Sequence, residues 1–193
     1  MDNEKYIELI KERLSEARFI HSMNVAKSAA ELAEKYGADR EKAYTAGILH
    51  DIMKEETHEA QRAYITRNGI ALTELEKLHG QVLHQMAGAL YCRWELGIDD
   101  EEILGAVRYH TTGRRNMTLL EKVVYTADFI SEDRCYPDGE VMREKAQISL
   151  EEAMLYSLRY TVNSLSSKTL LIHPDTLECY NWIIENEMKR KIV

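Results

Sequence analysis

The chain has 193 residues, of which 45% are hydrophobic and 30% charged, and its formal net charge at pH 7 is −8. This acidic balance argues against non-specific nucleic-acid binding, which depends on a broad basic surface. The three cysteines are odd in number and widely separated, so they indicate neither a disulfide framework nor a Cys-x-x-Cys metal site.

Two prolines, nine glycines and an abundance of Ala, Glu, Leu and Lys predict an all-α fold, because no sustained alternating run indicates a strand. The N-terminal residues are polar, and no stretch reaches the roughly 20 apolar residues of a membrane span. We therefore expect a cytoplasmic protein that binds neither nucleic acid nor a membrane. A chain of this length is most simply one domain, residues 1–193.

Capping and stop signals predict the helices in chain order. Ser15, Asp39 and Thr118 are N-cap candidates, and residues 73–76 resemble a capping box. In the first half, helices are expected at about 4–15, 16–36, 40–51, 57–67 and 80–96. In the second half, they are expected at about 100–110, 118–130, 149–167 and 175–189, with a loop marked by Pro137 and Gly139.

An apolar run over residues 43–49 ends on the adjacent pair His50-Asp51. At helical spacing His50 shares a face with the small residues Ala46 and Gly47, so its imidazole points inward, and Asp51 lies about 100° around the axis. A buried His next to a carboxylate is a common structural feature by itself. A chemical role depends on whether further His and Asp residues reach the same place.

Four further residues face inward from separate predicted helices: His21, His84, His110 and Asp128. Four imidazoles and two carboxylates in one helical core would cost many kcal/mol to bury unless metal ions bind them. Two metal ions fit better than one, because six ligands leave coordination positions open for water and substrate if one Asp bridges. The mixed ligand set suits Fe, Mn or Co more than a thiolate-type Zn site, and it does not choose among them.

Two cations about 3.5 to 4 Å apart lower the pKa of a bridging water and hold the oxygens of a phosphoryl group during in-line attack. The constellation therefore predicts a two-metal reaction site that could act on a phosphoryl group. The other histidines, His58, His79 and His173, lie in polar or loop-like segments and are expected at the surface or in structural contacts.

The candidate ligands stand within longer segments that resemble a known family. These segments are Arg18-Phe19-x-His21-Ser22, His50-Asp51-Ile52-Met53-Lys54, His84-x-x-x-Gly88-Ala89, Arg108-Tyr109-His110-Thr111-Thr112-Gly113-Arg114, Leu120-Glu121-Lys122 with Tyr125-x-Ala127-Asp128, and His173-Pro174-Asp175-Thr176 with Tyr180-Asn181. They resemble the HD-domain metal-dependent phosphohydrolase superfamily in its dinuclear form. More narrowly, they resemble the YqeK family of bacterial symmetrical diadenosine tetraphosphate hydrolases, over nearly the whole chain.

The resemblance implies an HD-domain helical bundle with a dinuclear metal site, its core spanning about residues 16–132 and C-terminal helices at about 140–190 packing on it. It also implies that the metal is iron and that a metal-bridging hydroxide splits the substrate into two ADP. By matching motif, one metal would take His21, His50, Asp51 and Asp128, and the other Asp51, His84 and His110. Catalytic roles would fall on Asp51, Lys54 and Arg114, and substrate contacts on Arg18, Lys54, Thr111, Thr112, Gly113, Arg114 and Arg134.

Two segments depart from the family pattern. Ser131-Glu132 stands where the family usually has Glu-Pro, and Gln85-Met86 follows His84 where the family has Gly-Pro. Both departures bear on substrate preference more than on metal binding.

Three alternative functions stay open at this point. They are an HD phosphohydrolase of nucleoside mono- or triphosphates, a non-catalytic nucleotide-sensing module, and a helical structural protein without metal. Oligomeric state is open as well, because the amphipathic terminal helices would serve either a monomer core or a homodimer contact.

Overall fold

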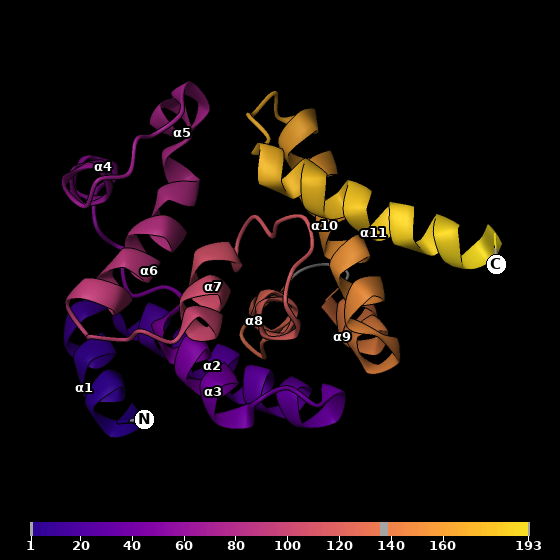
Figure 1. The fold of residues 1–193 in the computed structure, drawn as a ribbon. Helices are drawn as coiled ribbons and strands as arrows, with labels where there is room; N and C mark the ends of the chain where they lie inside the picture. The colour runs from indigo at the N-terminus through magenta and orange to yellow at the C-terminus, as the bar shows by residue number, and fades with distance from the viewer. Residues whose placement is uncertain (1, 136–138, 193) are drawn as a thin grey trace.

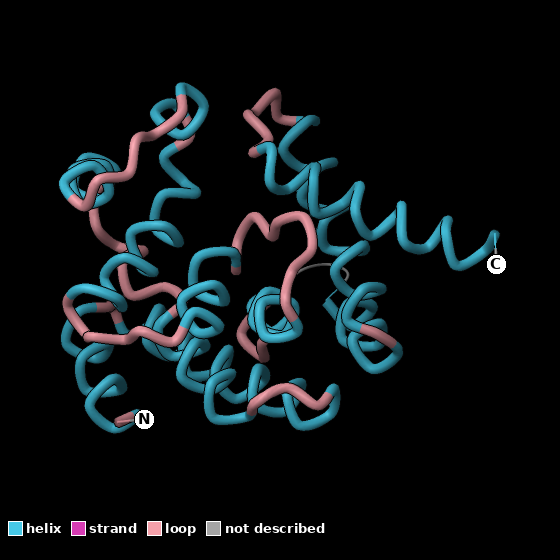
Figure 2. The backbone as a smooth tube through the Cα atoms, in the orientation of Figure 1, coloured by secondary structure: helices cyan, strands magenta, loops and turns pink. Residues whose placement is uncertain are grey.

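The computed structural model describes residues 2–135 and 139–192, and within these ranges every regular element is helical. Figure 1 shows how the helices are arranged, and Figure 2 shows the loops that join them. The first elements are α1 (Asn3–Arg13), α2 (Glu16–Tyr36), α3 (Arg40–Leu49), α4 (His58–Arg67), α5 (Glu74–Leu78), the 3-10 turn η1 (Gly80–Val82) and α6 (Leu83–Trp94). They are followed by α7 (Glu101–Tyr109), α8 (Leu119–Ile130), α9 (Gly139–Ile148), α10 (Leu150–Ser167) and α11 (Pro174–Ile192). The all-α prediction is confirmed for the described residues.

The helices begin where capping chemistry in the sequence predicts. The side chains of Ser15 and Asp39 accept backbone N–H groups at the starts of α2 and α3. Thr73 and Thr118 each form a capping box, in which a glutamate three residues later accepts the backbone N–H of the threonine. Gly37 ends α2 in the left-handed conformation, with φ 79°, that glycine adopts without strain.

Three features differ from the predicted helices. α3 ends at Leu49, so His50 and the residue after it lie just beyond the helix. The helix predicted from residue 80 begins with η1, and α6 starts at Leu83.

The third difference is that two helices lie outside the predicted ranges. For α5 the sequence predicts only the capping box at its start. The helix α9 begins at Gly139, which the sequence marks as a loop, and its buried side chains are only Met142 and Ala146, too sparse a pattern to indicate a helix. Pro137, the other residue of that predicted loop, lies outside the described residues.

The core of the fold depends on the close packing of α2 against α3, which α7 and α8 help to enclose. A Cβ atom at Gly47 would lie 2.5 Å from the Cα atom of Ala26, so the two backbones approach more closely than a side chain permits. This contact seats the end of α3 directly against α2.

The C-terminal helices bury a second, smaller apolar cluster against α8. It consists of Met117, Tyr125, Met154, Leu158, Cys179 and Ile183. Figure 1 shows α9, α10 and α11 gathered on one side of α8. Across the described chain, no helix combines the length and the apolar character that crossing a membrane requires.

We predict that Gly47→Ala destabilises the protein although alanine is the better helix former. The added methyl meets the backbone of Ala26, and such overpacking should lower the free energy of unfolding by about 1–3 kcal/mol. Gly88→Ala in α6 is the matched control, because a Cβ there meets its nearest atom at an ordinary 3.4 Å. Urea unfolding of the two variants tests the prediction, and equal stability would contradict it.

Candidate metal centre

The six predicted metal ligands converge in the core from five helices. His21 lies on α2, His84 on the first turn of α6 and Asp128 near the end of α8, whereas His50, Asp51 and His110 directly follow α3 and α7. All six are buried, Asp51 with 2% of its surface exposed and His50 with none. Their ligand atoms form overlapping groups that could hold metal ions.

The carboxylate of Asp51 lies at the centre of the group and divides it in two. Its Oδ1 atom faces Nε2 of His84 at 3.3 Å and Nε2 of His110 at 3.4 Å. Its Oδ2 atom faces Nε2 of His50 at 3.4 Å and Nε2 of His21 at 3.9 Å. One carboxylate with two imidazoles on each oxygen is an arrangement that could bridge two cations.

Asp128 completes the Oδ2 side of this arrangement. Its Oδ1 atom lies 3.0 Å from Nε2 of His21 and 3.9 Å from Nε2 of His50. The two sides are therefore unequal, because one offers two imidazoles and a second carboxylate whereas the other offers two imidazoles alone.

Each imidazole is oriented by a partner on its other nitrogen. The Nδ1 atoms of His50, His84 and His110 lie 2.7 to 2.8 Å from the carbonyl oxygen three residues earlier. Because a carbonyl only accepts, Nδ1 carries the proton and the lone pair of Nε2 points into the centre. His21 instead has its Nδ1 2.7 Å from Oδ2 of Asp133.

Charge at the centre favours ionised carboxylates. Burial opposes ionisation of Asp51, but the imidazoles of His50 and His110 and the Lys54 ammonium hold the pKa of Asp51 well below its usual value. Burial likewise opposes ionisation of Asp128, whose pKa is nevertheless held well below its usual value by neighbouring cations, Arg134 first.

The histidines respond to burial in two ways. Burial and the neighbouring ammonium of Lys54 lower the pKa of His84 well below its usual value, and burial lowers that of His110, so both candidate ligands are neutral imidazoles. Burial also opposes protonation of His50, but Asp51 and Asp128 outweigh it and raise the pKa of that imidazole. The charge of the two carboxylates therefore favours a cation on this side.

These residues fit divalent metal ions. The Nε2 atom of His50 is buried and finds no hydrogen-bond partner among the described residues, a costly state that metal coordination would relieve. Imidazole nitrogens and carboxylate oxygens form a borderline donor set, which suits first-row transition metals.

Four of the predicted substrate contacts lie beside the ligands. Nη1 of Arg18 donates to Oδ2 of Asp51 at 2.8 Å, and Nη2 of Arg134 donates to Oδ1 of Asp128. Nζ of Lys54 lies 3.2 Å, and Oγ1 of Thr111 3.1 Å, from Nε2 of His84. The two guanidinium side chains and the ammonium place positive charge around a centre that is otherwise rich in carboxylate oxygen.

The other three predicted contacts have structural partners. The Thr112 hydroxyl donates to the carbonyl oxygen of Gly113 at 2.9 Å. A Cβ atom at Gly113 would lie 2.7 Å from Sγ of Cys179, so this loop passes closely over α11. The Arg114 guanidinium donates to Oε1 of Glu121 at 2.9 and 3.2 Å, which ties it to the start of α8.

Two functional side chains escaped the sequence analysis. Gln85, 1% exposed, accepts the backbone N–H groups of Thr111 and Thr112 and donates to the Thr112 hydroxyl, all within 3.2 Å. It thereby clamps the segment after His110 to α6. The other is Asp133, which orients His21. The position of Gln85 directly after the candidate ligand His84 could have indicated a supporting role. The role of Asp133 could not be predicted, because its partner His21 lies 112 residues away in the sequence.

The remaining histidines occupy other surroundings. His58 is exposed and His79 half-buried. His173 is buried, with Nε2 3.6 Å from Oε1 of Glu76, which joins the segment before α11 to α5.

Comparison with known proteins agrees with this centre. The model of the HD domain family matches residues 18–133, which include all six candidate ligands. The chain belongs to the HD domain family.

The curated relatives narrow this assignment. A protein of Bacillus subtilis (strain 168) is 39% identical over 95% of this chain and 98% of its own length, and one of Halalkalibacterium halodurans is 40% identical with the same coverage. Both are named "Bis(5'-nucleosyl)-tetraphosphatase, symmetrical". The narrower family resemblance seen in the sequence is thereby confirmed.

A crystal structure from Clostridium acetobutylicum shares the fold, with a TM-score of 0.94 and 34% sequence identity over 96% of this chain and 98% of that one. It is described as a predicted HD superfamily hydrolase involved in NAD metabolism. The HD-domain helical bundle is therefore confirmed.

We predict that Asp133→Ala weakens metal binding without touching a ligand. Loss of the partner that orients His21 should lower the affinity for one of two metal ions by about 10- to 100-fold. Exposed Asp99 provides a control, Asp99→Ala, with the same change of charge. Calorimetric titration with Mn²⁺ measures both affinities, and an equal effect of the two substitutions would refute the orienting role.

Proposed function

We propose that the chain is a metal-dependent phosphohydrolase that splits diadenosine tetraphosphate symmetrically into two ADP. The observation that carries this proposal is the buried Asp51 carboxylate, which has two imidazoles on each oxygen. The names of nearly full-length relatives support the substrate.

The proposed ligand sets follow the two sides of the Asp51 carboxylate. One cation would be held by His21, His50, Asp51 and Asp128, and the other by Asp51, His84 and His110. Two such cations would activate a water and stabilise the phosphoryl oxygens during attack. Iron is the metal we expect, and the donor set also suits Mn or Co.

The polyphosphate would be bound by the cationic side chains around the centre. Arg18, Lys54 and Arg134 give this part of an acidic protein a local positive charge, which suits a polyanion. Lys54 and the Thr111 hydroxyl would hold phosphate oxygens in position, and Lys54 would offset charge that develops on them. For Arg114, whose guanidinium also pairs with Glu121, we keep the predicted contact with the phosphate oxygens.

Two further expectations concern the cell and the assembly. We propose a cytoplasmic location, which the three free cysteines support because reducing compartments keep thiols free. The homodimer stays an untested prediction.

The first test removes the proposed bridge. Asp51→Ala should lose both metal ions and all turnover of diadenosine tetraphosphate, because each ion loses a ligand and the pair loses its shared carboxylate. Metal content is read by elemental analysis and turnover by chromatography of the nucleotides. Retained turnover with metal still bound would refute the assignment.

The second test separates phosphate binding from metal binding. Lys54→Ala should keep both metal ions but lower kcat by about 100-fold, the usual loss when one donor to a developing negative charge is removed. Lys11→Ala, on the exposed face of α1, is the control for the loss of a charge. If Lys54→Ala loses metal as well, the ammonium is a structural contact of His84 and the phosphate role falls.

A further inference from the structure

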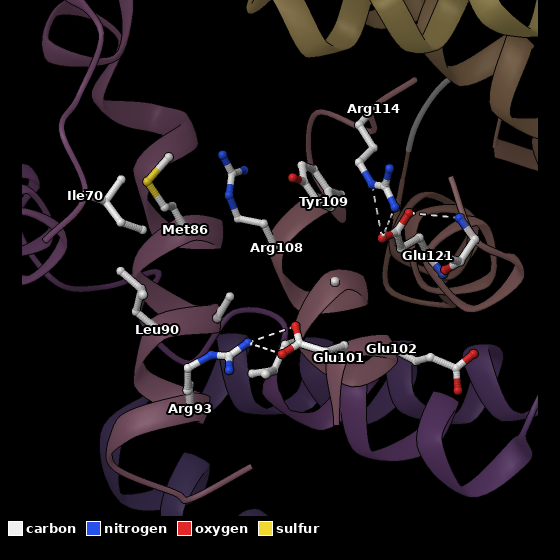
Figure 3. A pocket seen from close by; sticks show the side chains of 14 residues that line it. Ile70, Met86, Leu90, Arg93, Glu101, Glu102, Arg108, Tyr109, Arg114 and Glu121 are labelled. Atoms are coloured by element: carbon white, nitrogen blue, oxygen red, sulfur yellow. Dashed lines mark hydrogen bonds and ion pairs between the residues drawn. The ribbon is translucent and has the colours of Figure 1, made fainter. Parts of the chain in front are cut away.

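A cavity of about 550 Å³ lies between α6, α7 and the start of α8 (Figure 3). It is separate from the metal centre, because the helices turn opposite faces to the two sites. On α6, Met86 and Arg93 of the cavity lie roughly 200° and 180° around the axis from His84. On α7, Arg108 lies roughly 160° from His110.

The wall on the α6 side of the cavity is apolar. Ile70, Met86 and Leu90 line it, and in Figure 3 they stand across the space from Arg108 and Tyr109. The guanidinium carbons of Arg108 and Arg114 lie 4.8 and 4.9 Å from the centre of the Tyr109 ring. The first of these cation–π contacts holds Arg108 in place without neutralising its charge.

Two of the three arginines of the cavity already have carboxylate partners. Arg93 donates to both oxygens of Glu101 at 2.6 and 2.8 Å, and Arg114 is paired with Glu121. Arg108 differs, because within the described chain it makes no ion pair and its buried Nη1 has no hydrogen-bond partner. Figure 3 shows the guanidinium of Arg108 directed into the cavity, so an anion there would meet a positive charge that no carboxylate partner offsets.

We propose that this cavity is a second binding site, for a small organic anion with an apolar body. Its acidic group pairs with Arg108, and its body packs against Ile70, Met86 and Leu90. The volume suits such a ligand, because small-molecule sites measure about 300–1,000 Å³ and are mostly apolar with a few convergent polar groups. A nucleoside phosphate and an aliphatic carboxylic acid both combine an acidic group with an apolar body, so the test includes one of each.

The test uses the metal-loaded full chain and 1-anilinonaphthalene-8-sulfonate, an aromatic sulfonate whose fluorescence rises in an apolar site. We expect one molecule to bind per chain and to be displaced by ADP or by octanoate, but not by adenosine or octanol, which lack the acidic group. Displacement by ADP alone identifies a nucleotide site, and displacement by octanoate alone identifies a carboxylate site.

Two substitutions locate the binding. Arg108→Met keeps an apolar stem but removes the charge, and should weaken binding about tenfold or more, the loss expected for one charge-assisted hydrogen bond. Arg93→Met removes an arginine of the same cavity that is already paired with Glu101, and should change the affinity less than about threefold. Leu90→Glu places a negative charge on the apolar wall and should also weaken binding by about tenfold or more. Metal content should match the unsubstituted protein in all three variants, which also shows that each one folds.

Several results would overturn the proposal. One is an affinity for the sulfonate in Arg108→Met equal to that of the unsubstituted protein. Another is an equal loss of affinity in Arg108→Met and Arg93→Met, which would indicate non-specific attraction. Failure of the sulfonate and both anions to bind at millimolar concentration would overturn it as well. If Arg108→Met does not fold, unchanged binding in Leu90→Glu refutes the site.

Discussion

The buried carboxylate of Asp51 is the constraint on which the rest of the structure depends. It lies in an apolar helical core with four imidazoles around it, and such a group is tolerated only where other groups compensate its charge. Five helices must therefore each bring a side chain to the same point, and two of them, α3 and α7, end there. The close approach of α2 and α3 at Gly47 is one device that achieves this, because it brings the end of α3 against the helix that carries His21.

Helix ends give the site its chemistry. Three of the four imidazoles donate to a carbonyl oxygen three residues earlier, so the backbone near a helix terminus fixes both their orientation and their tautomer. The same placement leaves the Nε2 atoms directed at one small volume. The helical core thus directs imidazole nitrogens and ionised carboxylate oxygens at one point, and no flexible loop is needed to bring them together.

The sequence predicted the parts of this site that follow from helical periodicity. His21 and Asp128 could be assigned to inward faces because one residue in three or four along their helices is apolar. Asp133 and the Arg114–Glu121 pair could not be assigned in this way, because each depends on which segments meet in space. The phosphate contact of Arg114 stays a prediction, and the fold adds a pairing with Glu121 that the sequence did not indicate. The helix α9 was not predicted, because its two buried side chains are too few to define an apolar face in the sequence.

In the proposed reaction, two cations held by Asp51 would promote cleavage of a four-phosphate chain at its middle. The most direct measurement is an anaerobic incubation of the protein with diadenosine tetraphosphate and Fe, Mn, Co, Mg or Zn, followed by ion-exchange separation of the nucleotides. We expect ADP as the sole product, with Fe, Mn or Co effective. Formation of AMP together with ATP would show asymmetric cleavage and contradict it.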